Sequence, residues 1–317
     1  MNLDVTPLFQ PLKIRNKKLP NRIVMPAMRT NMGIITPQGI EWYRQRARGG
    51  VGLVIVEATP VPDFKSGRLT LKHLKPLADI IHDGGALAVI QLIPLSFQRH
   101  VLQPGEIERQ EIEEILQNFQ KATEICLEAG FEGVEPHGAH GYLFNQFFSP
   151  VKNRRTDEFG GTMANRMRLA LNVVTKLRPI LGDDGLLFYR HTPVGEGYGL
   201  TESVSFAEAL VQSGVDVLDL SPSSIEYPGD RSFPFKELGV PVIAVNELNQ
   251  VQRALEVLNH KRADLVAVGR GLIADPDWPR KIREGRFQDI LECIGCNQGC
   301  FGNLEKDLLV QCTQWEA

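Results

Sequence analysis

The sequence predicts an α/β protein built as a (β/α)8 TIM barrel with a C-terminal cysteine-rich, metal-binding appendage. Eight short runs rich in Val, Ile and Leu recur along the chain, and stretches with helical periodicity separate them. The first of these runs is not followed by the glycine-rich turn that opens a dinucleotide-binding sheet. The chain has 317 residues, which exceeds the roughly 250 residues typical of such a barrel and leaves room for an appendage.

Eight segments are expected to form the parallel strands of the barrel. They are Arg22–Ala27, Gly52–Glu57, Leu87–Leu92, Gly133–His137, Leu186–Arg190, Val215–Leu220, Val242–Val245 and Asp264–Val268. Helices are expected at Glu111–Ala129 and Met163–Leu181, where apolar residues recur with a period of about 3.6. We expect the barrel to occupy residues 1–290 and the cysteine-rich segment, packed on the barrel, to occupy residues 291–317.

Charge and hydropathy exclude several functional classes. The chain carries 35 Lys and Arg against 38 Asp and Glu, a net charge of −3, and the two signs are interspersed. This distribution lacks the basic patch that nucleic-acid binding requires. No signal-peptide pattern begins the chain, and no apolar run approaches the roughly 18 residues of a membrane span. We therefore expect a soluble, cytoplasmic protein that binds neither nucleic acid nor membranes.

Two histidines and a tyrosine follow the fourth expected strand, at the end of the barrel where active sites form. His137, His140 and Tyr142 lie within six residues. Paired imidazole N–H groups bind and polarise a carbonyl or phenolate oxygen, while a phenol delivers a proton to carbon. This combination suits the reduction of a conjugated C=C bond. A structural histidine pair and a two-ligand metal site remain the alternatives.

Arg190 and His191 end the fifth expected strand. Their side chains alternate, so only one of them points into the barrel mouth. An arginine there would favour the reduced anionic form of a flavin, and Gln91 at the end of the third strand would bind the same ring edge. The alternative for Arg190 is an ion pair with a barrel carboxylate, Asp219 or Glu57. We expect His191 to pack in the protein interior.

Gly269 and Arg270 follow the eighth expected strand in a Gly-Arg-Gly turn. Phosphate groups commonly bind after the seventh and eighth strands of this barrel, where glycine lets the backbone approach a ligand. An ordinary loop is the alternative interpretation of so short a motif.

Four of the five cysteines lie in the last 25 residues. Cys293, Cys296, Cys300 and Cys312 follow the spacing C-x2-C-x3-C-x11-C, whereas Cys126 lies alone in the body of the chain. Three thiols in a short turning loop and a fourth at a distance suit a 4Fe-4S cluster. Structural zinc sites more often use two separate CxxC pairs, so zinc is the less favoured metal.

Taken together, several segments resemble the Old Yellow Enzyme superfamily of FMN-dependent oxidoreductases. The resemblance is to its iron–sulfur branch, which includes 2,4-dienoyl-CoA reductase and trimethylamine dehydrogenase. It covers nearly the whole chain, at residues 8–12, 21–26, 46–53, 137–150, 153–161, 165–166, 263–270 and 293–300. Agreement over so many segments is not explained by chance.

The resemblance implies FMN at the strand ends and a specific set of contacts to it. The implied contacts come from Pro26, Ala27, Met28, Ala58, Gln91, Arg190, Gly269 and Arg270. His137 and His140 would bind the substrate oxygen of an enone or enoyl thioester. Hydride would pass from flavin N5 to the β-carbon of this alkene, Tyr142 would protonate the α-carbon, and electrons would reach FMN through the 4Fe-4S cluster.

Three departures from the family pattern stand out. Residues 91–97 lack the His and the Gly-Arg pair that usually follow Gln91. Asn246 and Glu247 replace two glycines that cradle the FMN phosphate, and a carboxylate there would be unfavourable. The sequence ends at Ala317 and contains no dinucleotide fingerprint. A separate FAD and NAD(P)H reductase subunit, or an electron carrier such as ferredoxin, would then supply electrons, unless the sequence is truncated.

Other functions remain open at this point. The same apparatus would serve a flavin dehydrogenase or demethylase that oxidises an amine or alcohol, or a redox-neutral double-bond isomerase. With only three Trp and five Tyr, an aromatic cage for an amine is less favoured. A non-catalytic barrel stabilised by zinc is the alternative from a different class. The sequence leaves the oligomeric state open, a homo-oligomer included.

Overall fold

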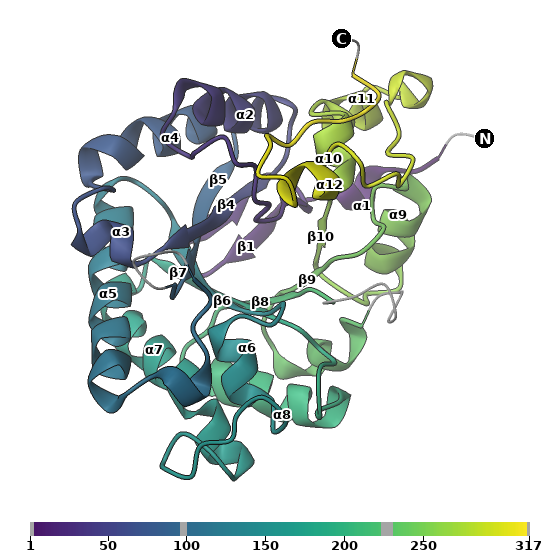
Figure 1. Cartoon of the computed structure of the whole chain (residues 1–317). Helices are drawn as coiled ribbons and strands as arrows, with labels where there is room; N and C mark the ends of the chain where they lie inside the picture. The colour runs from purple at the N-terminus through teal and green to yellow at the C-terminus, as the bar shows by residue number, and fades with distance from the viewer. Residues whose placement is uncertain (1–2, 96–99, 223–230, 316–317) are drawn as a thin grey trace.

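A computed structural model describes residues 3–95, 100–222 and 231–315 of the chain. Eight parallel strands close into a barrel in the order β10-β3-β4-β5-β6-β7-β8-β9, and helices surround it (Figure 1). The strands are β3 (Ile23–Met25), β4 (Leu53–Pro60), β5 (Leu87–Ile93), β6 (Gly133–Gly138), β7 (Leu186–His191), β8 (Val217–Leu220), β9 (Val242–Ala244) and β10 (Leu265–Ala267). The structure thus confirms the predicted (β/α)8 class and the position of all eight predicted strands. Residues 96–97 and Ala317, which the sequence analysis named, lie outside the described residues.

Within the described residues, one or two α-helices lie between most successive barrel strands, α1 precedes the barrel, and three follow its last strand. The helices are α1 (Thr6–Phe9), α2 (Pro37–Arg48), α3 (Pro62–Lys65), α4 (Leu71–Asp83), α5 (Arg109–Glu128), α6 (Leu143–Phe148), α7 (Met163–Leu181), α8 (Leu200–Gln212), α9 (Val251–Asn259), α10 (Arg270–Ala274), α11 (Trp278–Arg283) and α12 (Phe301–Leu304). Helix α7 has the predicted bounds. Helix α5 begins two residues before the predicted start, because Glu108 and Glu111 form a capping box in which the Glu108 N–H donates to the Glu111 carboxylate at 2.8 Å. In the described part of the chain, every helix is too short or too polar to cross a membrane.

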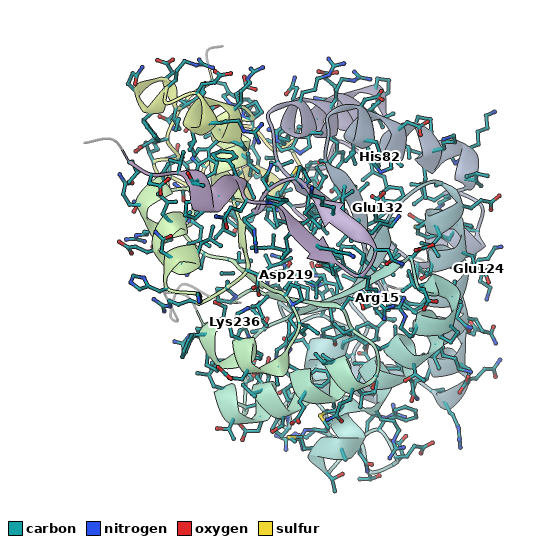
Figure 2. The ribbon with its side chains drawn as sticks, turned by 180° about the vertical axis from the view of Figure 1, so that it is seen from behind. Arg15, His82, Glu124, Glu132, Asp219 and Lys236 are labelled. Carbon is teal, nitrogen blue, oxygen red and sulfur yellow. The ribbon has the colours of Figure 1, made fainter. Side chains whose placement is uncertain are left out.

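A hairpin that the sequence analysis did not predict closes the N-terminal end of the barrel. It consists of β1 (Leu12–Ile14) and β2 (Lys17–Leu19), and its Ile14 and Leu19 pack with the apolar side chains that fill the lower barrel. Arg15, which Figure 2 labels, lies in its turn and forms an ion pair with Asp216. Because apolar side chains fill this end, the polar layer of the barrel lies toward the C-terminal ends of the strands.

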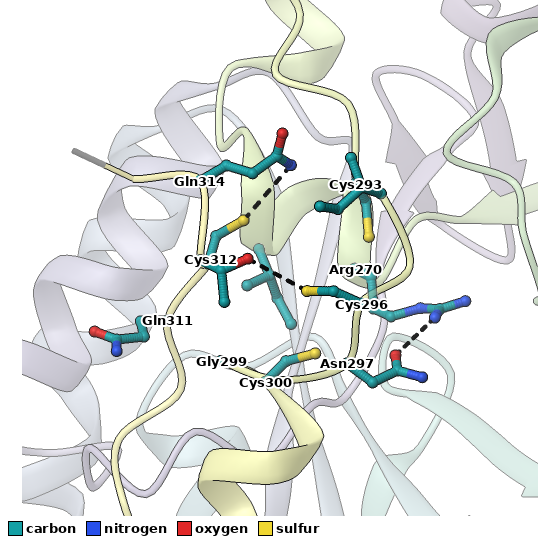
Figure 3. Close-up of a pocket in the computed structure, with 12 residues that line it drawn as sticks. Arg270, Cys293, Cys296, Asn297, Gly299, Cys300, Gln311, Cys312 and Gln314 are labelled. Atoms are coloured by element: carbon teal, nitrogen blue, oxygen red, sulfur yellow. Dashed lines mark hydrogen bonds between the residues drawn. The ribbon is translucent and has the colours of Figure 1, made fainter. Parts of the chain in front are cut away.

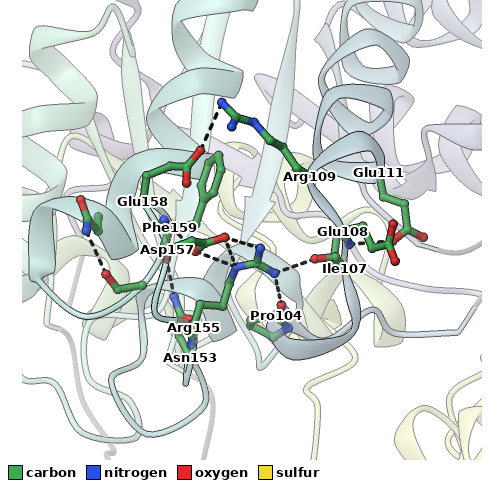
Figure 4. A network of polar contacts seen from close by, with 12 residues as sticks. Pro104, Ile107, Glu108, Arg109, Glu111, Asn153, Arg155, Asp157, Glu158 and Phe159 are labelled. Atoms are coloured by element: carbon green, nitrogen blue, oxygen red, sulfur yellow. Dashed lines mark hydrogen bonds and ion pairs between the residues drawn. The ribbon is translucent and has the colours of Figure 1, made fainter.

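A polar network ties together two loops on the C-terminal side of the barrel (Figure 4). Arg155, in the segment between α6 and α7, donates from Nη1 to the carbonyl oxygens of Pro104 and Ile107, each at 2.6 Å. Its Nε donates to Asp157 Oδ1 at 3.0 Å. Because charge-assisted bonds of this kind are strong, Arg155 joins the segment that leads into α5 to the segment that leads into α7.

Candidate active site

Strand register brings the polar side chains of four neighbouring strands into one layer inside the barrel. Gln91 on β5 lies opposite Glu135 on β6, His137 on β6 lies opposite Arg190 on β7, and Arg190 lies opposite Asp219 on β8. Side chains two residues apart on a strand share a face, so Glu135 and His137 both point inward. The sequence analysis did not single out Glu135, although its spacing from His137 carried this signal.

His191 lies outside the barrel, as the alternation of side chains predicted. Its side chain is fully buried, and its Nε2 lies 2.9 Å from Ser203 Oγ. Its ring packs edge-on against Phe148 and Phe206, with centroid separations of 5.8 and 5.4 Å. The expected packing role of His191 is therefore confirmed, and Arg190 is the residue of this pair that points into the barrel.

Arg190 is buried and contacts three neighbouring groups. Its Nη1 donates to the Ala27 carbonyl oxygen at 3.2 Å, and its Nη2 donates to Ser221 Oγ at 3.1 Å. Its Nε lies 3.5 Å from Asp219 Oδ2, which makes Asp219 the ion-pair partner. The other carboxylate that the sequence analysis considered, Glu57, does not pair with Arg190. The guanidinium thus joins the turn after β3 to the end of β8.

Glu57 instead holds the turn that follows β3. Its carboxylate accepts hydrogen bonds from the Thr30 N–H at 2.9 Å and from Thr30 Oγ1 at 2.7 Å. Burial raises the pKa of Glu57. These bonds fix the turn containing Pro26, Ala27 and Met28, and Ala58 follows Glu57 on β4.

His137, His140 and Tyr142 come together at the barrel mouth. The His137 ring centroid lies 5.1 Å from that of His140 and 4.8 Å from that of Tyr142. Burial lowers the pKa of His137 well below its usual value and lowers the pKa of His140 to about 3, and Arg190 nearby adds to both effects. Both imidazoles are therefore neutral near pH 7. Each neutral ring carries one N–H donor and one acceptor nitrogen.

Two bonds hold the His140 loop in an uncommon conformation. His140 has a φ of 58°, a left-handed value that few non-glycine residues adopt. Its N–H donates to Thr192 Oγ1 at 3.0 Å, and the Gly141 N–H donates to Asn145 Oδ1 at 2.9 Å. The His140 ring contacts Ser221, with Nε2 2.8 Å from the hydroxyl oxygen. The sequence analysis did not identify Asn145, Thr192 or Ser221; the partners of Thr192 and Ser221 are far away in sequence, whereas Asn145 is only four residues from Gly141.

The turns after the first and last barrel strands lie side by side. A Cβ added to Gly269 would lie 3.3 Å from Met28 Sδ and 3.8 Å from Pro26 Cγ, so glycine permits this close approach. One buried nitrogen at the mouth, Nδ1 of His137, has no hydrogen-bond partner among the described residues, whereas Nε of Arg190 lies 3.5 Å from Asp219 Oδ2. A polar atom of a ligand at the mouth would satisfy the His137 nitrogen. The chemistry of this site therefore fits a ring with polar edges such as that of FMN.

The residues near the expected phosphate site have protein partners. Glu247 is half exposed and forms an ion pair with Arg253, and positive φ values at Asn246 and Glu247 shape this turn. The Glu247 charge, which the sequence analysis considered unfavourable beside a phosphate, is thus balanced by a neighbouring cation. Arg270 donates from Nη1 to Asn297 Oδ1 at 2.9 Å, so it joins the turn after β10 to the cysteine segment.

The four C-terminal cysteines line a single pocket (Figure 3). The residues lining it include Arg270, Cys293, Cys296, Cys300, Cys312 and Thr313. Cys296 Sγ lies 3.3 Å from Thr313 Oγ1, and this hydrogen bond lowers the pKa of Cys296, whereas burial raises the pKa of Cys300. The described residues contain no group of three or more His, Cys, Asp or Glu side chains arranged to hold a metal ion. The thiols nevertheless share one pocket, and this donor set fits an iron–sulfur cluster.

The cysteine segment contacts the barrel beside the turn after β3. The Val310 N–H donates to the Thr30 carbonyl oxygen at 3.0 Å. The indole Nε1 of Trp315 donates to the carbonyl oxygen of Ala274, the last residue of α10, at 2.9 Å. Thr30 therefore contacts both Glu57 inside the fold and the segment that carries the cysteines.

Comparisons with known proteins agree with this geometry. A profile of the NADH:flavin oxidoreductase / NADH oxidase family matches residues 7–102 and 94–289. An NADH oxidase from Thermoanaerobacter brockii is 36% identical over an alignment that covers 96% of this chain and 55% of that protein.

Two solved structures share the fold. A 2-naphthoyl-CoA reductase in complex with 2-naphthoyl-CoA gives a TM-score of 0.87 at 26% identity, covering 97% of this chain and 56% of the other. Histamine dehydrogenase from Rhizobium sp. 4-9 gives a TM-score of 0.86 at 25% identity, and the match covers 98% of this chain and 52% of the other. This chain thus spans about half the length of these relatives. The barrel, its polar mouth and these matches together show that the chain belongs to the NADH:flavin oxidoreductase / NADH oxidase family of FMN-dependent oxidoreductases, as the resemblance to the Old Yellow Enzyme superfamily predicted.

Proposed function

We propose that this chain binds FMN at the barrel mouth and reduces an activated C=C bond, as in an enone or an enoyl thioester. The observation that carries this proposal is the convergence of His137, His140 and Tyr142 beside the buried Arg190. The similarity to a reductase crystallised with 2-naphthoyl-CoA supports a conjugated thioester as the substrate class.

FMN supplies the two-electron redox chemistry of such a reaction. The residues proposed to hold it are Pro26, Ala27, Met28, Ala58, Gln91, Arg190, Gly269 and Arg270. Gln91 and Arg190 come from the inward-facing polar layer and would bind the polar edge of the ring. Gly269 leaves the backbone open beside Met28, which suits a close approach by a phosphate group.

The neutral state of the two histidines supports separate roles for the three proposed catalytic residues. A neutral imidazole donates an N–H to a substrate oxygen and polarises it without releasing a proton. His137 and His140 would therefore bind the substrate oxygen, and Tyr142 would be the group that delivers a proton to carbon. Arg190 donates to Ser221 Oγ, which favours donation of the Ser221 proton to His140 Nε2. His140 would then present its own N–H at Nδ1.

We further propose that the pocket at the C-terminus holds a 4Fe-4S cluster. Its ligands would be Cys293, Cys296, Cys300 and Cys312. The convergence of all four thiols in one pocket supports this proposal, and zinc remains the less favoured metal. A cluster of this kind supplies one-electron transfer. Anaerobic purification followed by assays of FMN, iron and acid-labile sulfide tests the cofactor content, and a colourless protein containing zinc would favour the non-catalytic barrel.

A separate FAD and NAD(P)H reductase subunit or an electron carrier such as ferredoxin is the proposed electron donor. Large apolar side chains are exposed on the cysteine segment, with Ile294 exposed by 67%, Phe301 by 55% and Leu308 by 52%. Several exposed apolar side chains on this one short segment support a protein docking surface there. Reduction of the protein by ferredoxin and by NADH with a reductase, compared in the same assay, distinguishes these donors.

A reoxidation experiment tests the alkene reductase proposal. The FMN-loaded protein is photoreduced without oxygen and then mixed with 2-cyclohexenone or 2-naphthoyl-CoA in a stopped-flow spectrometer. We expect flavin reoxidation with at least one alkene. Tyr142→Phe is expected to slow it, whereas Tyr189→Phe is the matched control, because the buried Tyr189 hydroxyl has no hydrogen-bond partner among the described residues. Absence of reoxidation by every alkene tried would contradict the proposal.

Amine oxidation is the second candidate, and the structural similarity to histamine dehydrogenase favours it. The same protein in its oxidised form is mixed with histamine and with primary and tertiary alkylamines. Bleaching of the flavin by an amine, together with no reoxidation by alkenes, would assign the site to a dehydrogenase. Migration of a double bond without net redox change would instead assign it to an isomerase.

A further inference from the structure

Two fully buried carboxyl groups lie around a single arginine in the polar layer of the barrel. Glu135 on β6 and Asp219 on β8 are both 0% exposed, and Arg190 lies between them on β7 (Asp219 is labelled in Figure 2). The roles proposed above for the histidines, Tyr142 and the FMN contacts do not use these carboxyl groups. A buried carboxylate is costly unless charge and hydrogen bonds compensate it, so the pair requires an explanation.

Three of the four oxygens of these two carboxyl groups receive no hydrogen bond from the described residues. Glu135 Oε1 accepts a bond from Gln91 Nε2 at 2.7 Å. Glu135 Oε2 and both carboxyl oxygens of Asp219 have no hydrogen-bond partner among the described residues. The two Nη atoms of Arg190 donate to Ala27 and Ser221, and its Nε is 3.5 Å from Asp219 Oδ2. A proton on one carboxyl group would supply a donor to the other.

The balance of charge leads to the same conclusion. With both carboxyl groups ionised, this layer would hold two negative charges against the one positive charge of Arg190. The groups that act on Glu135 from the neighbouring strands are Gln91, which is uncharged, Arg190 and Asp219. His137, two residues along the same strand, is neutral. Burial and the charge of Asp219 raise the pKa of Glu135 to about 8, and burial raises the pKa of Asp219. One retained proton makes the layer neutral.

We propose that Glu135 and Asp219 share one proton, and that Glu135 in its protonated form is a positioning residue for Gln91. With one N–H of Gln91 Nε2 donated to Glu135 Oε1, the orientation of the Gln91 amide is fixed, and its carbonyl oxygen and second N–H are the groups available to a ligand at the mouth. The proton sharing is a property of the barrel itself, whereas the ligand of Gln91 rests on the proposed function.

Substitutions at Glu135 test whether its carboxyl group shares a proton with Asp219 or is ionised. Glu135→Gln is an isostere of the protonated acid, since its amide oxygen still accepts from Gln91 and its amide N–H still donates to Asp219. Glu135→Leu removes both bonds. Glu124→Gln alters an exposed glutamate on α5 (Figure 2) and is the matched control.

Two measurements use these variants over a pH range centred on the Glu135 pKa of about 8. The first is the FMN dissociation constant, measured by fluorescence quenching. We expect it to rise for the wild type by up to about tenfold per pH unit above this pKa, because ionisation adds a second negative charge to the layer. Glu135→Gln is expected to keep its low-pH affinity throughout, Glu135→Leu to bind more weakly at every pH, and Glu124→Gln to follow the wild type.

The second measurement is urea unfolding of the protein without FMN. A carboxyl group whose pKa is raised in the folded state binds more protons folded than unfolded, so wild-type stability falls as pH rises from the unfolded pKa of about 4.3 through the folded pKa. We expect this decline in the wild type and in Glu124→Gln, with a shallower decline in Glu135→Gln. Equal declines in the wild type and Glu135→Gln would overturn the proton sharing.

The FMN measurement also separates the positioning role from the proposed function. If Glu135→Gln weakened FMN binding at low pH as strongly as Glu135→Leu, Glu135 would be an ionised partner of Arg190 and the positioning role would be wrong. If the wild type bound no FMN at any pH, the proposed function would fail, while the urea experiment would still decide whether the proton is shared.

Discussion

Trp315 is expected to hold the cysteine segment against the barrel. Its indole Nε1 donates to the Ala274 carbonyl oxygen at 2.9 Å, and its ring meets that of Trp42 edge-on with the centroids 6.3 Å apart. Loss of one such hydrogen bond costs about 1 kcal/mol, and loss of an aromatic pair costs about 1 kcal/mol more. Trp315→Phe removes the hydrogen bond and leaves a ring, whereas Trp315→Ala removes both contacts.

Hydrogen exchange at the Val310 amide measures this effect. The amide donates to the Thr30 carbonyl oxygen and becomes exchangeable when the segment leaves the barrel. Because 1.4 kcal/mol corresponds to a factor of ten, we expect its protection to fall about fivefold in Trp315→Phe and about 30-fold in Trp315→Ala. The measurement is hydrogen exchange followed by mass spectrometry on the metal-free protein.

Two controls accompany this experiment. Phe301→Leu changes another aromatic side chain of the segment, one that is 55% exposed, and is expected to leave the Val310 protection unchanged. The Leu187 amide, which donates to Asp216 Oδ2 at 2.8 Å, reports on the barrel and is expected to stay protected in all variants. Unchanged protection of Val310 in Trp315→Ala would refute the anchoring role.

Three further predictions concern the barrel. Tyr142→Phe is expected to lower the rate of alkene-dependent flavin reoxidation by about 10²- to 10⁴-fold without changing FMN affinity, since only proton delivery is lost. An unchanged rate in the stopped-flow spectrometer would show that another group is the proton donor. Arg190→Met is expected to weaken FMN binding and lower the reduction potential of the flavin, because the cation paired with Asp219 is lost. If spectroelectrochemistry finds the wild-type potential in this variant, the flavin ring does not lie beside Arg190. The hydrogen bond to Glu132, partly opposed by burial, raises the pKa of His82. The stability that this pair contributes is therefore present below pH 6.5 and is lost as pH rises through the folded-state pKa. The urea unfolding midpoints of His82→Gln and the wild type are expected to converge at high pH, and a difference that stayed constant across pH would contradict this.

Local sequence patterns determined much of the fold. Eight apolar runs between helical stretches predicted eight strands, because a strand buried on both faces needs apolar side chains on both. The alternation of side chains at Arg190 and His191 predicted that one points inward and the other outward, since the period of a strand is two residues. The β1–β2 hairpin was missed because each of its strands, Leu-Lys-Ile and Lys-Lys-Leu, has only three residues, a pattern too short to distinguish from a loop.

The candidate site was predictable in part. His137, His140 and Tyr142 are close in sequence, so their convergence needed only a turn. Tertiary structure was required to identify Ser221, which directly follows β8 and contacts both His140 and Arg190.

What the sequence by itself determined about this protein is its barrel class, its family and the residues that follow the strands, because periodicity and spacing are local properties. Only the tertiary structure decided that Arg190 pairs with Asp219 rather than Glu57, that Arg270 contacts the cysteine loop, and that Glu135 lies buried beside Gln91. The Arg270 contact joins the turn after β10 to the cysteine segment, whereas the other two contacts join neighbouring barrel strands. Their pairing depends on barrel register, and burial in the closed barrel sets the protonation of the groups that meet there.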